Sequence, residues 1–281
     1  MRFGWPTGVT HQADRMRTLW TWSSVAALIV GIIVWGLIFW CCGRYRKKDD
    51  VLPKQMKYHL PIEIAYTIAP FVIIAGLFYY TAVTENYVDK LSAHPDVTVQ
   101  VDAFKWNWQF EYLESKGAQT SYGQGDPAAD EPLSTVGSDD EIPVLVIPVD
   151  RRIRIIEHSY DVIHSFWVPQ FLFKRDVIPF DTETTTHDNR FEFDPISRGI
   201  FVGRCAELCG TYHSQMNFEV RIVTAQQFAD YLSQLKSIGS TNPARQQLAL
   251  ERANIPGGGR ATTTIPFDTS RTQNSATAQG S

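Results

Sequence analysis

Two long stretches without a charged residue dominate the first third of the chain. The first runs from Leu19 to Cys42 and the second from Ile64 to Thr84. As α-helices they would be about 36 Å and about 31 Å long, enough to cross the hydrocarbon core of a bilayer. A buried core helix is the alternative for any apolar run, but this length without a charge favours a transmembrane hairpin.

The segment between the two stretches is basic, since six cationic residues outnumber two acidic ones: Arg44, Arg46, Lys47, Lys48, Lys54 and Lys57 against Asp49 and Asp50. Basic loops stay in the cytoplasm. We therefore expect an extracytoplasmic segment over 1–18, transmembrane helices over 19–42 and 63–84, and a cytoplasmic loop over 43–62. Residues 1–18 lack the apolar core of a signal peptide, so either a leader was removed or the first span directs insertion itself.

Downstream of the hairpin the pattern changes to short alternating runs. Val97–Tyr112 alternates apolar and polar residues and predicts a strand, as do the runs 144–149 and 153–156. Short strands with turn residues between them predict an all-β sandwich over 95–225, with a polar, acidic surface insertion over about 115–142. The last part, 226–281, predicts a short helix over 243–254 and an extended or disordered tail rich in glycine, serine and threonine.

One loop of this domain concentrates metal-binding side chains. Between Cys205 and Met216 lie two thiols, a carboxylate at Glu207 and an imidazole at His213. Soft sulfur ligands select copper, zinc or iron–sulfur clusters, imidazole suits copper and zinc, and a methionine thioether favours copper over zinc. A disulfide between Cys205 and Cys209 beside an incidental histidine is the alternative, but it leaves Met216 unexplained.

A single loop rarely completes a metal site, so we expect another ligand from elsewhere. His164 is the best candidate because its neighbours are apolar and predict a strand entering a buried site. His158 and His187 compete for this role, but their polar neighbours suit exposed positions. Two thiolates separated by three residues can bridge two metals. The inventory therefore fits two copper ions that share two sulfurs, each with one histidine and one weak ligand.

The pattern C-x-E-x-C-G-x-x-H-x-x-M, the upstream Asp161-Val-Ile-His164-Ser165 and the two apolar stretches resemble subunit II of the haem–copper cytochrome c oxidases. The resemblance covers about residues 20 to 225 and implies a Greek-key cupredoxin domain with a binuclear copper A centre. The implied copper ligands are His164, Cys205, Cys209, His213, Met216 and the backbone carbonyl of Glu207. The Glu207 side chain would face a magnesium site shared with subunit I.

The resemblance also suggests roles for two residues outside the loop. Glu63, followed by Tyr66, Thr67 and Pro70 at the family's spacing, would lie at the cytoplasmic mouth of a proton pathway into subunit I. A carboxylate simply solvated at the membrane interface is the alternative. Trp106 matches the first position of the family's Trp-x-Trp motif, which receives electrons from cytochrome c. Packing in the sandwich is the alternative for Trp106 and the interpretation for Trp108.

The implied function is that of a subunit of an oxidoreductase and translocase. It would take electrons from cytochrome c on the outer face of a bacterial plasma membrane and pass them to haem in subunit I, where oxygen is reduced and protons are pumped. Subunit III would be a further partner. The net charge of -4 does not encourage a nucleic-acid partner, and the chain has no C-x-x-C-H haem attachment motif, so oxygen chemistry needs a partner subunit.

Two alternatives stay open at this point, and the chain departs from the family's pattern in two places, one of which is the C-terminus from about Gly239. A membrane-anchored copper chaperone would need neither the methionine nor an acid in a second span, and a structural subunit, as in quinol oxidases, would lack the ligands. The family's Asp-x-Ile-Pro-Gly-Arg is replaced by the sequence from Asp176 to Asp181. The acidic insertion resembles that of actinobacterial oxidases, where the donor is a membrane-tethered cytochrome c in a supercomplex. A flexible loop without a partner is its alternative.

Overall fold

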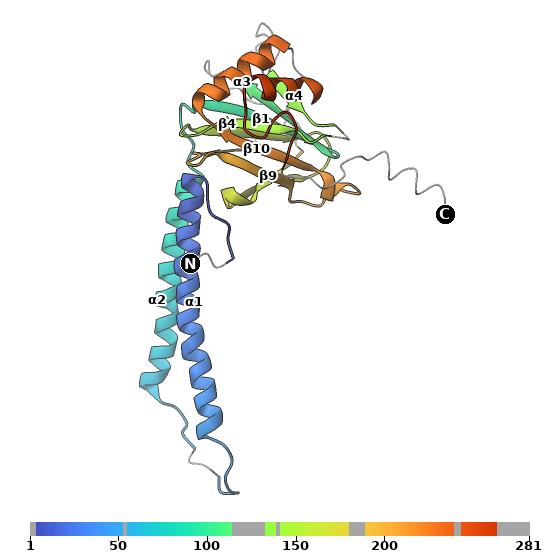
Figure 1. Ribbon diagram of the computed structural model, residues 1–281. Helices are drawn as coiled ribbons and strands as arrows, with labels where there is room; N and C mark the ends of the chain where they lie inside the picture. The colour runs from blue at the N-terminus through green and yellow to red at the C-terminus, as the bar shows by residue number, and fades with distance from the viewer. Residues whose placement is uncertain are drawn as a thin grey trace, which may run out of the picture. The chain divides into compact units, whose positions relative to one another are not determined.

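The computed structural model describes residues 4–52, 55–113, 133–138, 141–179, 189–238 and 243–262. The chain divides into two compact units (Figure 1). One comprises Met1–Trp5 and Arg15–Tyr87, and the other comprises Pro6–Asp14 and Val88–Ser281. His187 and most of the predicted acidic insertion lie outside the described residues.

The first unit contains most of two long apolar helices, α1 (His11–Arg44) and α2 (Leu60–Val88). Both are long and apolar enough to cross a membrane, and most of their large apolar side chains are exposed. Exposure of so much apolar surface is unfavourable in water and favourable in lipid. The guanidinium of Arg15 lies 4.9 Å from the ring centroid of Tyr87 and links the two helices. The prediction of two apolar helices ahead of a β domain is confirmed, and the membrane boundaries stay a prediction.

The second unit is a sandwich of two five-stranded sheets, with strand orders β3-β2-β1-β5-β8 and β4-β10-β9-β6-β7. The first sheet holds β1 (Val97–Phe104), β2 (Asn107–Leu113), β3 (Leu133–Val136), β5 (Ile153–Ser159) and β8 (Arg190–Phe193). The second holds β4 (Val144–Pro148), β6 (His164–Val168), β7 (Phe173–Val177), β9 (Gly199–Cys205) and β10 (Asn217–Val223). The pairs β1–β5 and β4–β10 are parallel and the others antiparallel. The predicted all-β domain is confirmed.

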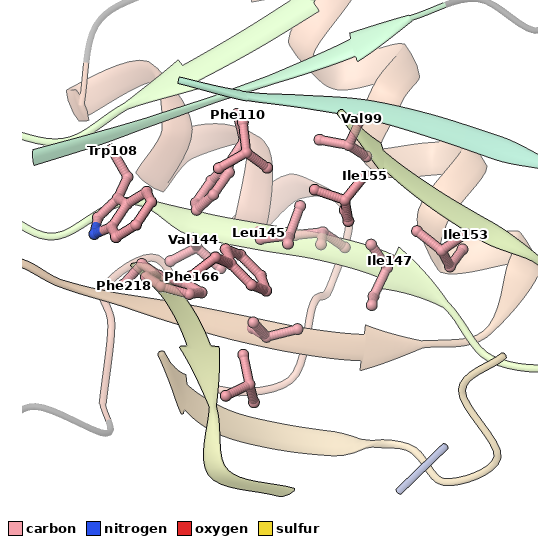
Figure 2. Close-up of a cluster of buried hydrophobic side chains, with 14 of the residues drawn as sticks. Val99, Trp108, Phe110, Val144, Leu145, Ile147, Ile153, Ile155, Phe166 and Phe218 are labelled. Atoms are coloured by element: carbon pink, nitrogen blue, oxygen red, sulfur yellow. The ribbon is translucent and has the colours of Figure 1, made fainter. Parts of the chain in front are cut away.

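Apolar side chains from the inner faces of both sheets form one core (Figure 2). At one end of this core Trp108 is fully buried and its ring meets that of Phe218 edge-on at 5.2 Å between centroids. Phe166 stacks on Phe218 at 4.7 Å. Aromatic pairs of this kind stabilise a core beyond the area that they bury. This cluster packs against the end of the cysteine loop, Cys205–Met216, because the Trp108 indole N–H donates to the Met216 carbonyl.

The run 97–112 is two strands and not the single strand that its alternation predicts. β1 and β2 pair in antiparallel register, from Thr98 opposite Leu113 to Phe104 opposite Asn107, and the chain reverses at Lys105 and Trp106. Neither residue is a typical turn former. The reversal is fixed by tertiary contacts instead, because the Lys105 N–H donates to the Asp161 carboxylate at 2.7 Å.

The residues after β10 form two helices, followed by a segment that is hydrogen-bonded to β10 of the second sheet. The helix α3 (Ala225–Ile238) was not predicted, although Thr224 and Gln227 cap its start reciprocally. The predicted helix over 243–254 is present as α4 (Pro243–Arg252). Part of the predicted loose tail is held in place: the buried guanidinium of Arg221 donates to the carbonyl oxygens of Gly258 and Arg260, at 2.5 and 2.7 Å.

We predict that Gly203→Ala destabilises the sandwich by about 1 to 3 kcal/mol, because an overpacked core must shift. A Cβ atom at Gly203 would lie 2.0 Å from a ring atom of Phe218. Thermal unfolding of the full chain measures the effect. The double variant with Phe218→Leu should lose less than the sum of the two single changes, since the smaller side chain relieves the clash. Strict additivity would contradict this explanation.

Candidate metal centre

Strand pairing brings the two ends of the cysteine loop together. Cys205 is the last residue of β9, and Met216 directly precedes β10, the antiparallel partner of β9. The Cys205 N–H donates to the Met216 carbonyl at 3.0 Å and closes the loop. Within the loop, the short 3-10 helix η2 (His213–Gln215) turns the chain back toward the sulfur atoms.

The predicted ligands converge on two sulfur atoms. Cys205 Sγ and Cys209 Sγ are 3.8 Å apart. His164 Nδ1 lies 3.8 Å from Cys205 Sγ, and His213 Nδ1 lies 3.5 Å from Cys209 Sγ. Met216 Sδ is 3.7 Å from Cys209 Sγ, so each sulfur has one imidazole and the thioether adds a further soft donor.

These separations fit shared metal ligation. Donor atoms that bind one tetrahedral ion at about 2.0 to 2.3 Å lie about 3.3 to 3.8 Å apart. The donors of His164, Cys205 and Cys209 all lie within 4.8 Å of one another and are buried. The carbonyl oxygen of Glu207 completes the set at 3.2 Å from Cys205 Sγ. The donors are two thiols, two imidazoles, a thioether and a carbonyl, a set whose soft ligands suit copper.

Asp161 orients the imidazole of His164. Its Oδ1 lies 2.8 Å from His164 Nε2 and also accepts the Val162 N–H at 2.6 Å. Since an ionised carboxylate only accepts, Nε2 carries the proton and Nδ1 presents its lone pair toward Cys205. Burial raises the pKa of Asp161, but the hydrogen bonds from His164, Lys105 and Val162 outweigh it and leave this pKa below its usual value.

The two thiols share a hydrogen bond that shifts their pKa values in opposite directions. The bond from Cys209 lowers the pKa of Cys205 well below that of an ordinary thiol, and backbone hydrogen bonds at Glu207 and Ser165 add to the shift. The same contact raises the pKa of Cys209. One sulfur is therefore poised as a thiolate before a metal binds, and metal binding displaces the remaining proton.

Both tryptophans of the Trp106–Trp108 pair contact the loop, from different positions. The Trp106 indole N–H donates to the Cys209 carbonyl at 3.0 Å, and its ring meets Tyr212 edge-on at 4.9 Å. Gly210, at φ +116°, lets the loop pass close to this ring. Trp108 is fully buried and donates to the Met216 carbonyl at 3.3 Å. The Trp106 ring, at the hairpin turn, is only partly buried.

Other residues considered from the sequence lie apart from this cluster. His158 is 7% exposed, contrary to the expectation of an exposed position, because it faces Asp102 on the adjacent strand at 3.6 Å. Glu63 belongs to the helical unit, where its carboxylate accepts the His59 N–H at 2.7 Å at the start of α2. The Glu207 side chain is partly buried. Asp161 has a positioning role that sequence reasoning missed.

Comparison with known proteins identifies the family. Residues 97–223 match the profile described as cytochrome c oxidase subunit II, periplasmic domain. The chain is 46% identical to a probable cytochrome c oxidase subunit 2 of Nocardia farcinica, over 99% of this chain and 84% of that protein. It is 40% identical to cytochrome c oxidase subunit 2 of Corynebacterium glutamicum, over 97% of this chain and 85% of that protein.

Among solved structures, the chain is similar to the periplasmic domain of subunit II of the Bradyrhizobium japonicum cytochrome oxidase. That likeness has 26% identity and a TM-score of 0.40, over 51% of this chain and 95% of the other. The two curated relatives match nearly the whole chain, helices and sandwich together. The chain therefore belongs to the cytochrome c oxidase subunit II family, whose members are components of an oxidoreductase complex.

Proposed function

We propose that this chain is the electron-accepting subunit of a proton-pumping cytochrome c oxidase. The observation that carries the proposal is the convergence of His164, Cys205, Cys209, His213 and Met216 about two sulfur atoms 3.8 Å apart. Together with the Glu207 carbonyl, these residues would hold two copper ions in a binuclear copper A centre. When bound, such a centre accepts and releases one electron at a time with little change of geometry.

The protein's own contribution is a rigid, buried frame for that exchange. The loop donors are fixed by the paired strands β9 and β10, and His164 is fixed by β6 and by Asp161. A site whose ligands are held by packed elements keeps its geometry through a redox change. Burial of the thiols excludes water from the sulfur atoms and protects them from oxidation.

Electrons would arrive from cytochrome c through Trp106. Its ring is partly buried at the hairpin turn and is joined to the Cys209 carbonyl by a hydrogen bond. They would leave to haem in subunit I, where oxygen is reduced to water. A donor tethered to the membrane within a supercomplex fits the resemblance to actinobacterial oxidases, since the two relatives named above come from Nocardia and Corynebacterium.

The remaining assignments complete this proposal. The two apolar helices would span the bacterial plasma membrane beside subunits I and III, with the copper domain on the outer face. Glu63, at the first turn of α2, would lie at the cytoplasmic entrance of a proton pathway. The Glu207 side chain would bind magnesium at the interface with subunit I.

Copper counting with electron paramagnetic resonance on the oxidised full-length chain tests the proposal. Two copper ions per chain with one unpaired electron shared by both nuclei is the expected result. One copper with a localised signal, or copper bound only in the reduced state, would instead support a membrane-anchored copper chaperone. Family membership and the thioether of Met216, 3.7 Å from Cys209 Sγ, favour the first outcome.

We also predict that Trp106→Leu slows electron transfer from reduced cytochrome c by an order of magnitude or more and leaves the copper content unchanged. The substitution removes the ring that joins the hairpin turn to the Cys209 carbonyl. Stopped-flow reduction of the assembled complex measures the rate. Trp35→Leu, on the exposed surface of α1, is the control. An unchanged rate in Trp106→Leu would remove Trp106 from the electron path.

A further inference from the structure

A buried glutamate lies inside the sandwich, in a position that the proposed electron path does not use. Glu157 is on β5 and shares the inward face of that strand with the core residues Ile153 and Ile155. Its side chain is fully buried, and in the described part of the chain neither carboxylate oxygen has a hydrogen-bond partner. A buried carboxyl without partners is costly when ionised, so such a group is a candidate proton-binding site.

The facing strand presents an arginine that is also incompletely paired. β5 contacts β7, where Arg175 lies opposite the core residue Phe166 and therefore faces the interior. Its Nε is buried and has no hydrogen-bond partner among the described residues. Its Nη2 lies 3.3 Å from Asp89, which is half exposed. Arg175 thus extends from the interior, near Glu157, toward the solvent-exposed carboxylate of Asp89.

Strand register connects this interior pair to the sulfur site. Phe166 on β6 lies opposite Arg175 on one side and opposite Cys205 on the other. Adjacent strands are about 4.8 Å apart, so the backbones at Arg175 and Cys205 are separated by about 10 Å. Phe166 lies between Arg175 and Cys205, and because its side chain is buried no solvent separates them there. Charge at the sulfur atoms and charge in the interior pair are therefore poorly screened from each other.

Few other charges face this part of the interior. Of the strands packed around Glu157, β1 and β8 turn only apolar side chains inward, and β6 adds His164. Asp176 and Lys174 lie on the other face of β7, and the outer face of the first sheet carries Asp102, Arg154, His158, Arg190 and Glu192. Burial raises the pKa of Glu157 well above its ordinary value; Arg175 lowers it in part, and Asp176 raises it.

We propose that Glu157 is a redox-linked proton-binding residue, which takes up a proton from solvent when the sulfur site gains an electron and returns it when that electron leaves. The inference rests on the copper A function proposed above. In the balanced step the donor supplies one electron to the site, and water supplies one proton to the Glu157 carboxylate. Reoxidation by the partner subunit reverses both transfers. Glu157 would act on the sulfur site through its charge alone, since among the described residues no hydrogen bond joins its carboxylate to a proposed ligand.

The expected coupling follows from Coulomb's law. Glu157 and Cys205 belong to the two facing sheets, and packed sheets stand about 10 Å apart. Two unit charges at about that separation, at an effective protein dielectric of about 20, change a binding constant by roughly tenfold. The reduced form should therefore bind this proton about ten times more tightly than the oxidised form. A tenfold ratio corresponds to about 59 mV for a one-electron couple. The midpoint potential should fall by about that amount as the pH rises through the pKa of Glu157, and stay level on both sides.

The experiment is a redox titration of the copper-loaded full-length chain in detergent at a series of pH values, for wild type and Glu157→Gln. The neutral amide should hold the potential at the wild-type low-pH level at every pH. Glu251→Gln, on the exposed part of α4, is the matched control and should keep the wild-type profile. Coinciding profiles for wild type and Glu157→Gln would overturn the inference and leave the copper A function intact. A chain that binds no copper would overturn both.

A second readout needs no metal. The pKa of Glu157 is raised in the folded state, so its stabilising contribution is complete below the ordinary carboxyl pKa and is lost as the pH rises through the folded pKa. Metal-free wild type should therefore lose more thermal stability across this window than Glu157→Gln, in which only other groups such as Glu111 and Glu141, whose pKa values burial also raises, still titrate. Arg175→Gln removes the opposing positive charge and should move the window to higher pH. Identical pH dependence in all three chains would overturn the proton-binding role.

Discussion

Replacing Cys209 with serine is expected to lower turnover of the assembled oxidase with cytochrome c by at least about 100-fold. Cys209 Sγ contacts three of the five other donors, with Cys205 at 3.8 Å, His213 at 3.5 Å and Met216 at 3.7 Å. Loss of a residue that only supports a ligand costs about 10- to 100-fold in metal affinity, so loss of a shared ligand should cost at least the upper value. Copper content and steady-state oxygen consumption measure the result.

The control for this prediction is Cys42→Ser, the same chemical change at an exposed position on α1. It should keep full copper content and turnover. Thermal unfolding of the metal-free Cys209→Ser chain should resemble that of metal-free wild type, since the two side chains are nearly the same size. If Cys209→Ser retained turnover with cytochrome c, the copper A assignment would be wrong, and a purely structural subunit would become the better interpretation.

The loop itself could be predicted from the sequence because its chemistry is local. Cys205, Cys209, His213 and Met216 lie within twelve consecutive residues, between two strand-like runs of which the second alternates in part. The structure pairs these two runs and so brings the loop ends together. The identity of the distant ligand needed one further argument. His164 was favoured over His158 by its apolar neighbours, and the structure places His164 beside Cys205 at 3.8 Å. The predicted fold class followed from the same alternation.

Features that depend on contacts between distant residues could not be predicted in this way. The reversal at Lys105 and Trp106 carries no turn residue, and the Asp161 carboxylate 56 positions away fixes it. His158 has polar neighbours in sequence, yet strand pairing places Asp102 next to it and buries both. A charged residue such as Glu157 would be expected at the surface, but its position on β5 places its side chain in the interior. The helix α3 is a different kind of omission, because its capping residues Thr224 and Gln227 are visible in the sequence.

The second large expected effect concerns Asp161, which holds three neighbours at once. We expect Asp161→Ala to weaken copper binding by about 10- to 100-fold, the usual cost of losing the partner of a metal-bound histidine. Without the carboxylate, His164 Nε2 loses its acceptor at 2.8 Å, and Nδ1 is no longer fixed as the unprotonated nitrogen. Competition of the full-length chain with a copper chelator, followed by optical absorption, measures the affinity.

Asp161→Asn separates orientation from the other contacts of this carboxylate. An amide can keep its oxygen at the position that meets His164 Nε2 and the Val162 N–H, but its NH₂ group then faces the Lys105 N–H, which loses its acceptor. The asparagine variant should therefore keep most of the copper affinity and instead loosen the hairpin turn that carries Trp106. Slower electron transfer at nearly normal copper content is its expected signature. Equal affinity losses for alanine and asparagine would show that the negative charge, and not the orientation of His164, is what the site requires of Asp161.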